Sequence, residues 1–299
     1  MIYLYSERDF DFKNVNVEID DFSTHRQAKE LEIRHNNLEF SSHIQHTHSL
    51  KKLFPKSYKS IFFSKKRDIE KKLKNKNFDL VVNFATLYKN SHLNSEIPEF
   101  IDSNITFPSI VLDTISSKVK KFINFGTMMQ HLNGLNHTPK NFYASTKSSF
   151  EMILNYYAFK NKKMKFYNLK LYESFFENDH RQKLIPTLFK NFKNNKITTI
   201  NSKNLELNII HVNDIINAIY TIIKHNVKSG TYCLKNHKNV KIKSLIKSIN
   251  NNSQKKIKIK FLQNRLIKPQ KNFLKILPKW KPNIRIREKI ENIFLNENS

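Results

Sequence analysis

The sequence has little cysteine, no long apolar run and few acidic residues. Its single cysteine, Cys233, excludes an internal disulfide. The neighbouring Thr231, Tyr232 and Leu234 indicate a strand, so we predict a buried structural thiol. No stretch of about 18 apolar residues occurs, so no transmembrane helix is expected. The first residues are acidic and lack the basic flank and apolar run of a secretory signal, so we expect a cytoplasmic protein.

Glycine is also scarce. The 299 residues contain three glycines, Gly126, Gly134 and Gly230, and none lies before residue 126. Glycine lets the backbone approach a bound phosphate closely, and such phosphates commonly rest on the N-terminus of a helix. The first 125 residues therefore contain no glycine-rich turn that would bind phosphate in this way.

Basic residues outnumber acidic ones, 53 Lys and Arg against 25 Asp and Glu, and the formal net charge is +28. Such a charge can indicate nucleic-acid binding. Here the excess is spread over every predicted element and consists mainly of Lys. The densest run, KKIKIK at 255–260, alternates as a half-exposed strand does, with Lys outward. We expect a general attraction to polyanions at low salt and no specific nucleic acid.

A metal site is not predicted. His43, His46 and His48 have a spacing that could suit a metal ion. No cysteine or carboxylate cluster accompanies them, and the segment is polar and loop-like.

Short apolar runs alternate with helical patterns in the first part of the chain. Strands are predicted at 80–84, 122–125 and 166–171, and helices at 97–117 and 143–159. This alternation predicts an α/β fold with a doubly wound parallel sheet, in which ligands bind beyond the carboxyl ends of the strands. Further elements are expected as helices at 184–192, 212–223 and 242–249 and a strand at 230–234.

The most informative segment joins a strand end to a helix. Thr127 follows the strand that ends in Asn124-Phe125-Gly126, and Tyr143 and Lys147 follow four residues apart. Positions i and i+4 share one helix face, so a phenol and an ammonium could address one small molecule. This set predicts proton transfer beside a carbonyl or alcohol, with Thr127 orienting the oxygen, Tyr143 moving the proton and Lys147 favouring the phenolate.

Each of these residues also has a plainer interpretation. Tyr143 could pack as an amphipathic aromatic, Lys147 could be one more surface lysine, and Thr127 could cap the following loop. Tyrosine and lysine stand four residues apart at two other places, Tyr156/Lys160 and Tyr220/Lys224. We favour catalysis at Tyr143 because Thr127 and an apolar strand precede it.

These motifs resemble those of the extended short-chain dehydrogenase/reductase family, the NAD-dependent epimerases and dehydratases of nucleotide sugars. The resemblance runs in order over most of the chain. It rests on VNVEIDDFST at 15–24, FDLVVNFA at 78–85, SNIT at 103–106, KFINFGT at 121–127, IHVND at 210–214 and KWKP at 279–282.

The resemblance implies NAD or NADP as cofactor. Asp20 then stands where an acid at the end of the second strand holds the adenosine ribose, although it could also cap a turn. Ala85 lies in the small-residue turn under the cofactor, Asn104 opens the next helix, and Lys147 also contacts the cofactor.

The resemblance further implies a nucleotide-sugar substrate and a homodimer. Arg265 resembles an arginine that grips the diphosphate, which suits its bidentate geometry. Glu173 begins the segment that replaces the family's sugar-site turn. Residues 1–171 are expected to form a Rossmann-like cofactor domain, to which part of 205–235 returns. Residues 172–299 are expected to form mainly a smaller α/β substrate domain.

Two departures from the family limit the function. Only fourteen residues precede the match to the second strand, too few for a strand, a glycine turn and a helix, so the first βα unit is expected to be incomplete. Met128 and Met129 stand where dehydratases of the family carry an acidic pair. We therefore expect an epimerase or a 4-keto reductase and not a dehydratase.

Two alternatives to an enzyme remain open. One is a degenerate family member that does not bind the dinucleotide and acts as a binding or scaffold protein. The other is a basic, polyanion-binding protein on the same fold.

Overall fold

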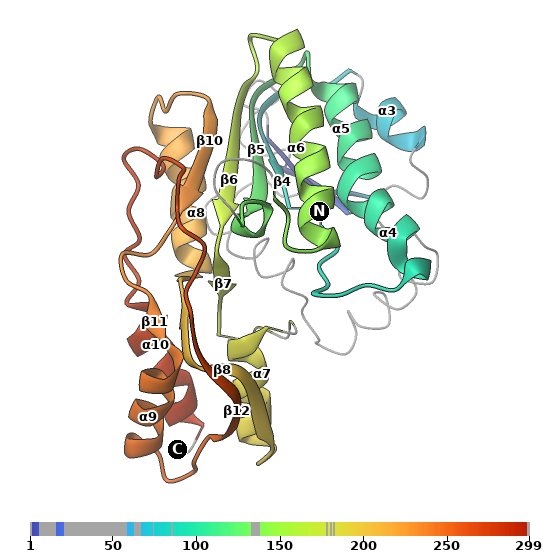
Figure 1. Ribbon diagram of the computed structural model, residues 1–299. Coiled ribbons are helices and arrows are strands. Elements are labelled where there is room, and N and C mark those ends of the chain that lie inside the picture. The colour runs from blue at the N-terminus through green and yellow to red at the C-terminus, as the bar shows by residue number, and fades with distance from the viewer. Residues whose placement is uncertain are drawn as a thin grey trace.

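The computed structural model describes residues 2–5, 16–20, 59–62, 67–73, 75–84, 86–132, 138–177, 179, 181 and 183–297. Figure 1 shows a larger part built on a sheet and, below it, a smaller part that contains the C-terminal helices. The large sheet has the strand order β10 (Gly230–Leu234), β6 (Lys165–Leu171), β5 (Val119–Thr127), β4 (Phe78–Asn83), β1 (Ile2–Tyr5), β2 (Asn16–Asp20), β3 (Lys59–Phe62).

Helices cover both faces of this sheet, as the alternating pattern predicts. On one face, α3 (Arg67–Leu73), α5 (Phe107–Ile115) and α6 (Phe142–Lys160) pack on apolar residues such as Val81 and Phe122. On the other, α8 (Val212–Lys224) packs on Leu80, Ile123 and Leu169. Strands β4, β5, β6 and β10 are mutually parallel. The predicted doubly wound α/β fold is therefore confirmed, and Cys233 is a buried thiol in β10.

Strand β1 departs from the expected parallel sheet. It pairs antiparallel with both β2 and β4, whereas β2 and β3 are parallel to each other. Ten residues separate β1 from β2, and a parallel connection needs a crossover of about a dozen or more. The register sets Ile2 beside Asn83 and Tyr5 beside Leu80. The carboxyl end of β1 therefore lies at the sheet edge opposite to the carboxyl end of β4.

Three asparagines form a ladder across the centre of the sheet. Asn83, Asn124 and Asn168 are in register on β4, β5 and β6 and are at most 1% exposed. Asn83 Nδ2 donates to Asn124 Oδ1 at 3.0 Å, and Asn124 Nδ2 donates to Asn168 Oδ1 at 2.8 Å. The ladder lies on the face covered by α5 and α6, near the carboxyl ends of the strands. It places polar groups in the core next to the predicted site.

The helix expected at 97–117 is interrupted. It consists of α4 (Ile97–Ile101), a π-helical turn η2 (Asp102–Thr106) and α5, and it follows a short 3-10 turn, η1 (Asn94–Glu96). The π turn contains Asn104, a residue that sequence motifs single out. Such turns are frequent near functional sites.

The smaller part is built on a three-stranded sheet, β11 (Val240–Lys241), β8 (Ile197–Leu207) and β12 (Lys258–Ile267). Helices α7 (Leu184–Lys193), α9 (Ile242–Asn252) and α10 (Ile286–Asn296) share an apolar core with it. The pair β7 (Glu173–Phe175) and β9 (Ile209–His211) links the two parts. The lysine-rich run enters β12 with Lys258 and Lys260 exposed, as predicted. Among the helices of the described ranges, none is long and apolar enough to cross a bilayer.

The asparagine ladder makes a testable prediction about stability. Asn124→Ala removes the central amide and with it the two buried hydrogen bonds that Asn124 makes to Asn83 and Asn168, so we expect the free energy of unfolding to fall by about 2–4 kcal/mol. Urea unfolding followed by circular dichroism measures the change. Asn217→Ala on exposed helical surface is the control and should change stability by less than about 0.5 kcal/mol. Equal stability of the two variants would contradict the role given to the ladder.

Candidate active site

Helix α6 carries Tyr143 and Lys147 in its first two turns. Asn141 caps this helix, because its side-chain oxygen accepts from Ala144 N at 3.0 Å while its backbone is extended. The helix therefore begins immediately before Tyr143, and Tyr143 and Lys147 share one face of it. That face points toward the carboxyl ends of β4 and β5.

Thr127 is the last residue of β5. Its hydroxyl accepts from Met129 N at 3.2 Å and caps the 3-10 turn η3 (Met128–Gln130). The plainer interpretation of Thr127 as a cap is thus observed. The hydroxyl also borders a cavity, so capping and contact with a ligand are compatible.

The structure brings Thr127, Tyr143 and Lys147 to one cavity of about 750 Å³. The wall is contributed mainly by the ends of β4 and β5, the segment 86–93, the start of α6, the segment 171–174, and Arg181 and Lys183. The residues that line it are Asn83, Phe84, Thr86, Tyr88, Lys89, Asn90, Ser91, His92, Leu93, Glu96, Phe125, Gly126, Thr127, Met129, Tyr143, Lys147, Leu171, Tyr172, Ser174, Arg181, Lys183 and Ile215.

Tyr143 is held as a neutral phenol. Burial raises its pKa to about 12, and a hydrogen bond with Thr86 opposes that rise. The ring of Tyr88 meets the ring of Tyr143 edge-on, with 4.9 Å between centroids. A phenol with this pKa carries its proton throughout the neutral range, so it is set to donate a proton rather than to accept one.

Lys147 is nearly fully buried, with 2% of its surface exposed. Burial, and to a smaller extent the charge of Lys170, lower the pKa of Lys147 to about 7, and the charge of Glu151 opposes the fall. The sequence predicts that the charge of Lys147 favours the phenolate of Tyr143. With a pKa of about 7, Lys147 carries this charge below neutral pH and loses it above.

Sequence reasoning missed a basic wall of the cavity. The Arg181 guanidinium is held by both carboxylate oxygens of Asp179, at 2.8 and 2.5 Å, and by Ser174. Lys183 pairs with Glu173 at 3.0 Å and lies 5.3 Å from the centroid of the Tyr88 ring. Lys and Arg are so abundant in this chain that neither residue stood out from its spacing.

Several predicted site residues lie elsewhere. Asn104 is buried, and its side-chain amide forms hydrogen bonds with the backbone of Leu87 and with the Thr146 hydroxyl. It therefore holds the segment 86–93 against α6. It does not line the cavity. Arg265 is exposed on β12, outside the cavity wall. Glu173 does not line the cavity either and reaches it only through Lys183.

Two other predicted cofactor residues have no described side chain. Asp20 is the last residue of β2, where only the backbone is described, and Ala85 lies outside the described residues. The histidines at 43, 46 and 48 also lie outside them. Within the described ranges, no group of three or more His, Cys, Asp or Glu side chains is arranged to hold a metal ion.

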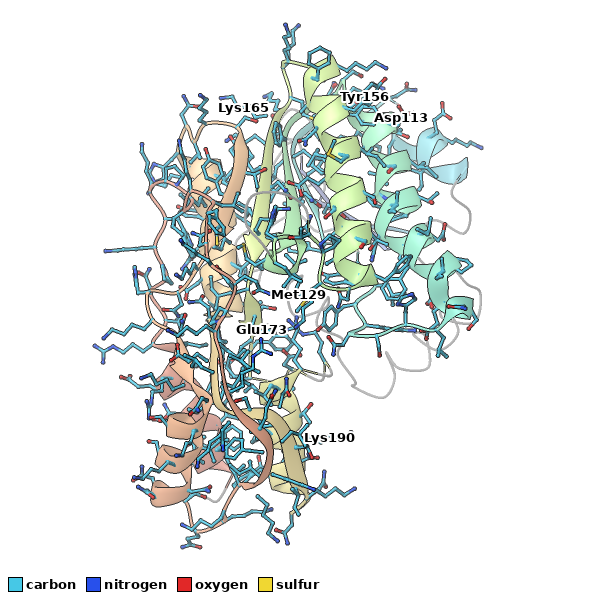
Figure 2. All side chains as sticks on the ribbon, viewed as in Figure 1. Asp113, Met129, Tyr156, Lys165, Glu173 and Lys190 are labelled. Atoms are coloured by element: carbon cyan, nitrogen blue, oxygen red, sulfur yellow. The ribbon has the colours of Figure 1, made fainter. Side chains whose placement is uncertain are left out.

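Met129 lines the cavity beside Thr127, and Met128 is buried. Figure 2 shows Met129 at the level where the large sheet meets the smaller part, above the labelled Glu173. A thioether has no proton to give. The positions after Thr127 therefore contribute apolar surface and not an acid or a base.

Comparisons with solved structures show the fold. A UDP-glucuronic acid 4-epimerase from Bacillus cereus, solved with UDP-glucuronic acid and NAD, has a TM-score of 0.69 at 18% identity and covers 93% of this chain and 89% of its own. A UDP-glucose 4-epimerase from Thermotoga maritima, solved with UDP-glucose, has a TM-score of 0.62 at 14% identity and covers 79% and 83%.

Two curated relatives are more similar in sequence. A CDP-abequose synthase from Yersinia pseudotuberculosis is 32% identical over 158 residues, which are 52% of this chain and 53% of that protein. A CDP-abequose synthase from Salmonella muenchen is 25% identical over 203 residues, or 65% and 67%. The match thus spans about half the length of the first relative.

The model of the NAD dependent epimerase/dehydratase family matches residues 37–234, well over half of the chain. That range includes β4, β5, α6 and β6, and hence Thr127, Tyr143 and Lys147. Together with the sheet order and the cavity at the carboxyl ends of the strands, this match establishes that the chain belongs to the NAD dependent epimerase/dehydratase family.

Proposed function

We propose that the chain is an NAD(P)-dependent oxidoreductase of a nucleotide-linked sugar, acting as a 4-keto reductase or an epimerase. The observation that carries the proposal is the approach of Thr127, Tyr143 and Lys147 to one cavity at the carboxyl ends of the strands. The names of the curated relatives and of the structural neighbours, which are a CDP-sugar synthase and UDP-sugar epimerases, support this substrate class.

The protonation state of Tyr143 favours the reductive direction. A ketone that gains a hydride becomes an alkoxide, which needs a proton, and the neutral phenol of Tyr143 can give one. A bound nicotinamide would supply the hydride. The Thr127 hydroxyl, on the same cavity wall, would orient the oxygen. Epimerisation would require Tyr143 to remove a hydroxyl proton first, and its raised pKa makes the necessary phenolate costly to form.

The basic wall fits the diphosphate of a nucleotide-linked sugar. Arg181, Lys183 and Lys89 line the cavity, whereas Glu96 is the one carboxylate among the described residues that line it. Asp179 and Ser174 fix the guanidinium of Arg181, and a fixed guanidinium binds phosphate oxygens with little loss of side-chain freedom. In this proposal Glu173 acts by holding Lys183.

Elimination of water is not part of the proposal. A dehydratase needs an acid and a base in addition to Tyr143. The turn η3 follows Thr127 directly, and its residue that lines the cavity is Met129, whose thioether has no proton to give.

The described residues fit only half of a dinucleotide. Tyr143, Lys147 and Thr127 suit its reactive end. The usual site for the pyrophosphate is the turn between the first strand and the next helix. Here β1 begins at the edge of the sheet where the cavity lies and ends at the opposite edge. The described residues therefore form no such turn beside the cavity. This favours, as a second candidate, a family member that has lost dinucleotide binding and acts as a binding or scaffold protein.

A binding comparison tests the fit. We expect NADH to bind no more than about tenfold more tightly than reduced nicotinamide mononucleotide, because the adenosine and pyrophosphate gain few contacts. Fluorescence titration of both ligands gives the two dissociation constants. A preference for NADH of about a thousandfold would show that another segment replaces the glycine turn. No binding of either ligand would favour the scaffold candidate.

Replacing Tyr143 tests the reaction. In assays with NADH or NADPH and a panel of 4-keto and unmodified nucleotide sugars, Tyr143→Phe should lower turnover by about 10² to 10⁴, because only the proton donor is lost. Thermal unfolding should be unchanged. Tyr220→Phe is a matched control, since Tyr220 also precedes a lysine by four residues but is 46% exposed on α8. Formation of a 4-keto-6-deoxy product from an unmodified hexose would refute the assignment.

We infer in addition that the chain forms a homodimer through α6. Met152, Tyr156 and Phe159 lie on one face of this helix and are 62%, 55% and 80% exposed. Their spacing of four and three residues makes a continuous apolar stripe next to α5, to which Tyr157 is tied through Asp113 at 2.5 Å. Figure 2 labels Tyr156 on α6 and Asp113 on the neighbouring α5.

Sedimentation velocity measures the oligomeric state and so tests this inference. Wild-type protein should sediment as a dimer, and Phe159→Glu should shift it to a monomer, because burying a charge in an apolar contact is costly. Leu262→Glu is the control, since Leu262 is 63% exposed on β12. A monomeric wild-type protein at micromolar concentration would contradict the inference.

A further inference from the structure

A buried cluster of charges lies behind the proposed catalytic residues. Tyr143, Lys147 and Glu151 stand at successive turns of the same face of α6. Behind Tyr143, the Lys147 and Glu151 side chains are 2% and 5% exposed, and Lys170 on β6 is fully buried. The Lys170 ammonium donates a hydrogen bond to the Glu151 carboxylate. Two lysines and one carboxylate are thus buried together, and of these three residues Lys147 is the one that lines the cavity.

The same carboxylate reaches the strand end that carries Thr127. Gln130 Nε2 donates to Glu151 Oε2 at 2.9 Å, and Gln130 Oε1 accepts from Thr127 N at 2.9 Å. Gln130 Nε2 also donates to Ser148 on α6 at 3.2 Å. Because the Gln130 side chain is completely buried, few other positions are open to it. Glu151 therefore fixes the distance between α6 and the end of β5.

Gly126 makes room for this cluster. A Cβ atom at Gly126 would lie 2.8 Å from Gln130 Oε1 and 2.8 Å from Lys170 Cδ, closer than packing allows. Gly126 is one of three glycines in the chain, and it lies where the side chains of Gln130 and Lys170 pack closely against β5. The backbone before Thr127 is thus shaped around the cluster.

We propose that Glu151, Gln130 and Lys170 are positioning residues, which hold Thr127 against α6 and set the charge state of Lys147. Burial disfavours the charged form of Lys147 most strongly. Lys170 repels that charged form as well, whereas Glu151 attracts it. The other titratable side chains on the cavity wall are Tyr143 on α6, Tyr88, Lys89, His92 and Glu96 on the facing segment, and Tyr172, Arg181 and Lys183. The consequence for turnover rests on the proposed function, whereas the charge state of Lys147 can be measured without it.

The experiment measures the reactivity of Lys147 across pH. Limited acylation with an amine-specific reagent, followed by mass spectrometry of the peptide, gives the pH at which Lys147 is half deprotonated. The wild-type midpoint is expected near pH 7. Lys170→Met removes the repulsion and leaves Glu151 to attract Lys147, so the midpoint should rise by at least about one pH unit.

Three further variants keep the result decisive. Lys165→Met, on the same strand but exposed, should leave the midpoint unchanged. Lys170→Arg keeps the charge and its partner and should keep the midpoint. If Lys170→Met fails to fold, Glu151→Gln with Lys170→Met removes the pair as a unit, which buried pairs tolerate better than loss of one partner. Its midpoint should lie above the wild-type one, because the repulsion by Lys170 that is removed is larger than the attraction by Glu151 that is lost with it.

A folded Lys170→Met protein with the wild-type midpoint would overturn the proposal, and so would an equal shift in Lys165→Met. In the activity arm, the pH profile of kcat in Lys170→Met should shift with the labelling midpoint. A labelling shift in a protein without any turnover would leave the positioning role intact and count against the proposed function alone.

Discussion

The site depends on the hydrogen bonds that the buried carboxylate of Glu151 accepts from Lys170 and Gln130. This carboxylate joins α6 to β6 through Lys170 and to the end of β5 through Gln130. A buried charge must be paired and hydrogen-bonded, and loss of one partner is costly. The helix that carries Tyr143 and Lys147 is therefore not free to slide along the sheet. The asparagine ladder beside it extends this polar layer across β4, β5 and β6, so the strand ends are held by directional bonds as well as by apolar packing.

Much of this architecture follows from the sequence. Apolar runs and helical spacing predict β4, β5, β6 and most helices, and the strand-end hydroxyl with the Tyr–Lys pair predicts the centre of the site. What the sequence does not reveal depends on direction and on partners. The reversed β1 follows from a connection too short for a crossover, and periodicity does not report strand direction. Lys170 interrupts an apolar strand. Nothing in the sequence indicates that its partner is Glu151, which lies 19 residues earlier on the facing helix.

Two sequence motifs separated by about 65 residues gain their meaning only in three dimensions. Trp280 Nε1 donates to the carbonyl of Asp214 at 2.9 Å, and the Asp214 carboxylate accepts from Asn283 N at 2.8 Å. The segment 279–282 thus packs on the start of α8 and closes one face of the large sheet. Lys279 has φ +62°, in the left-handed region that favours glycine. The Gly-Trp-x-Pro element that this segment resembles has glycine at this position, and glycine adopts a positive φ without steric strain. Here Lys279 adopts the positive φ, at a cost in conformational energy.

The high net charge and the catalytic site are connected through burial. An exposed lysine remains solvated and changes little in energy, so lysines can accumulate on the surface without selection for a partner. A buried lysine must find an acid or lose its proton. Within the part of the chain that the structure describes, Lys147 and Lys170 are the lysines buried most deeply, and both lie beside Glu151. Burial therefore distinguishes Lys147 and Lys170 from the many exposed lysines, a distinction that composition and spacing alone do not make.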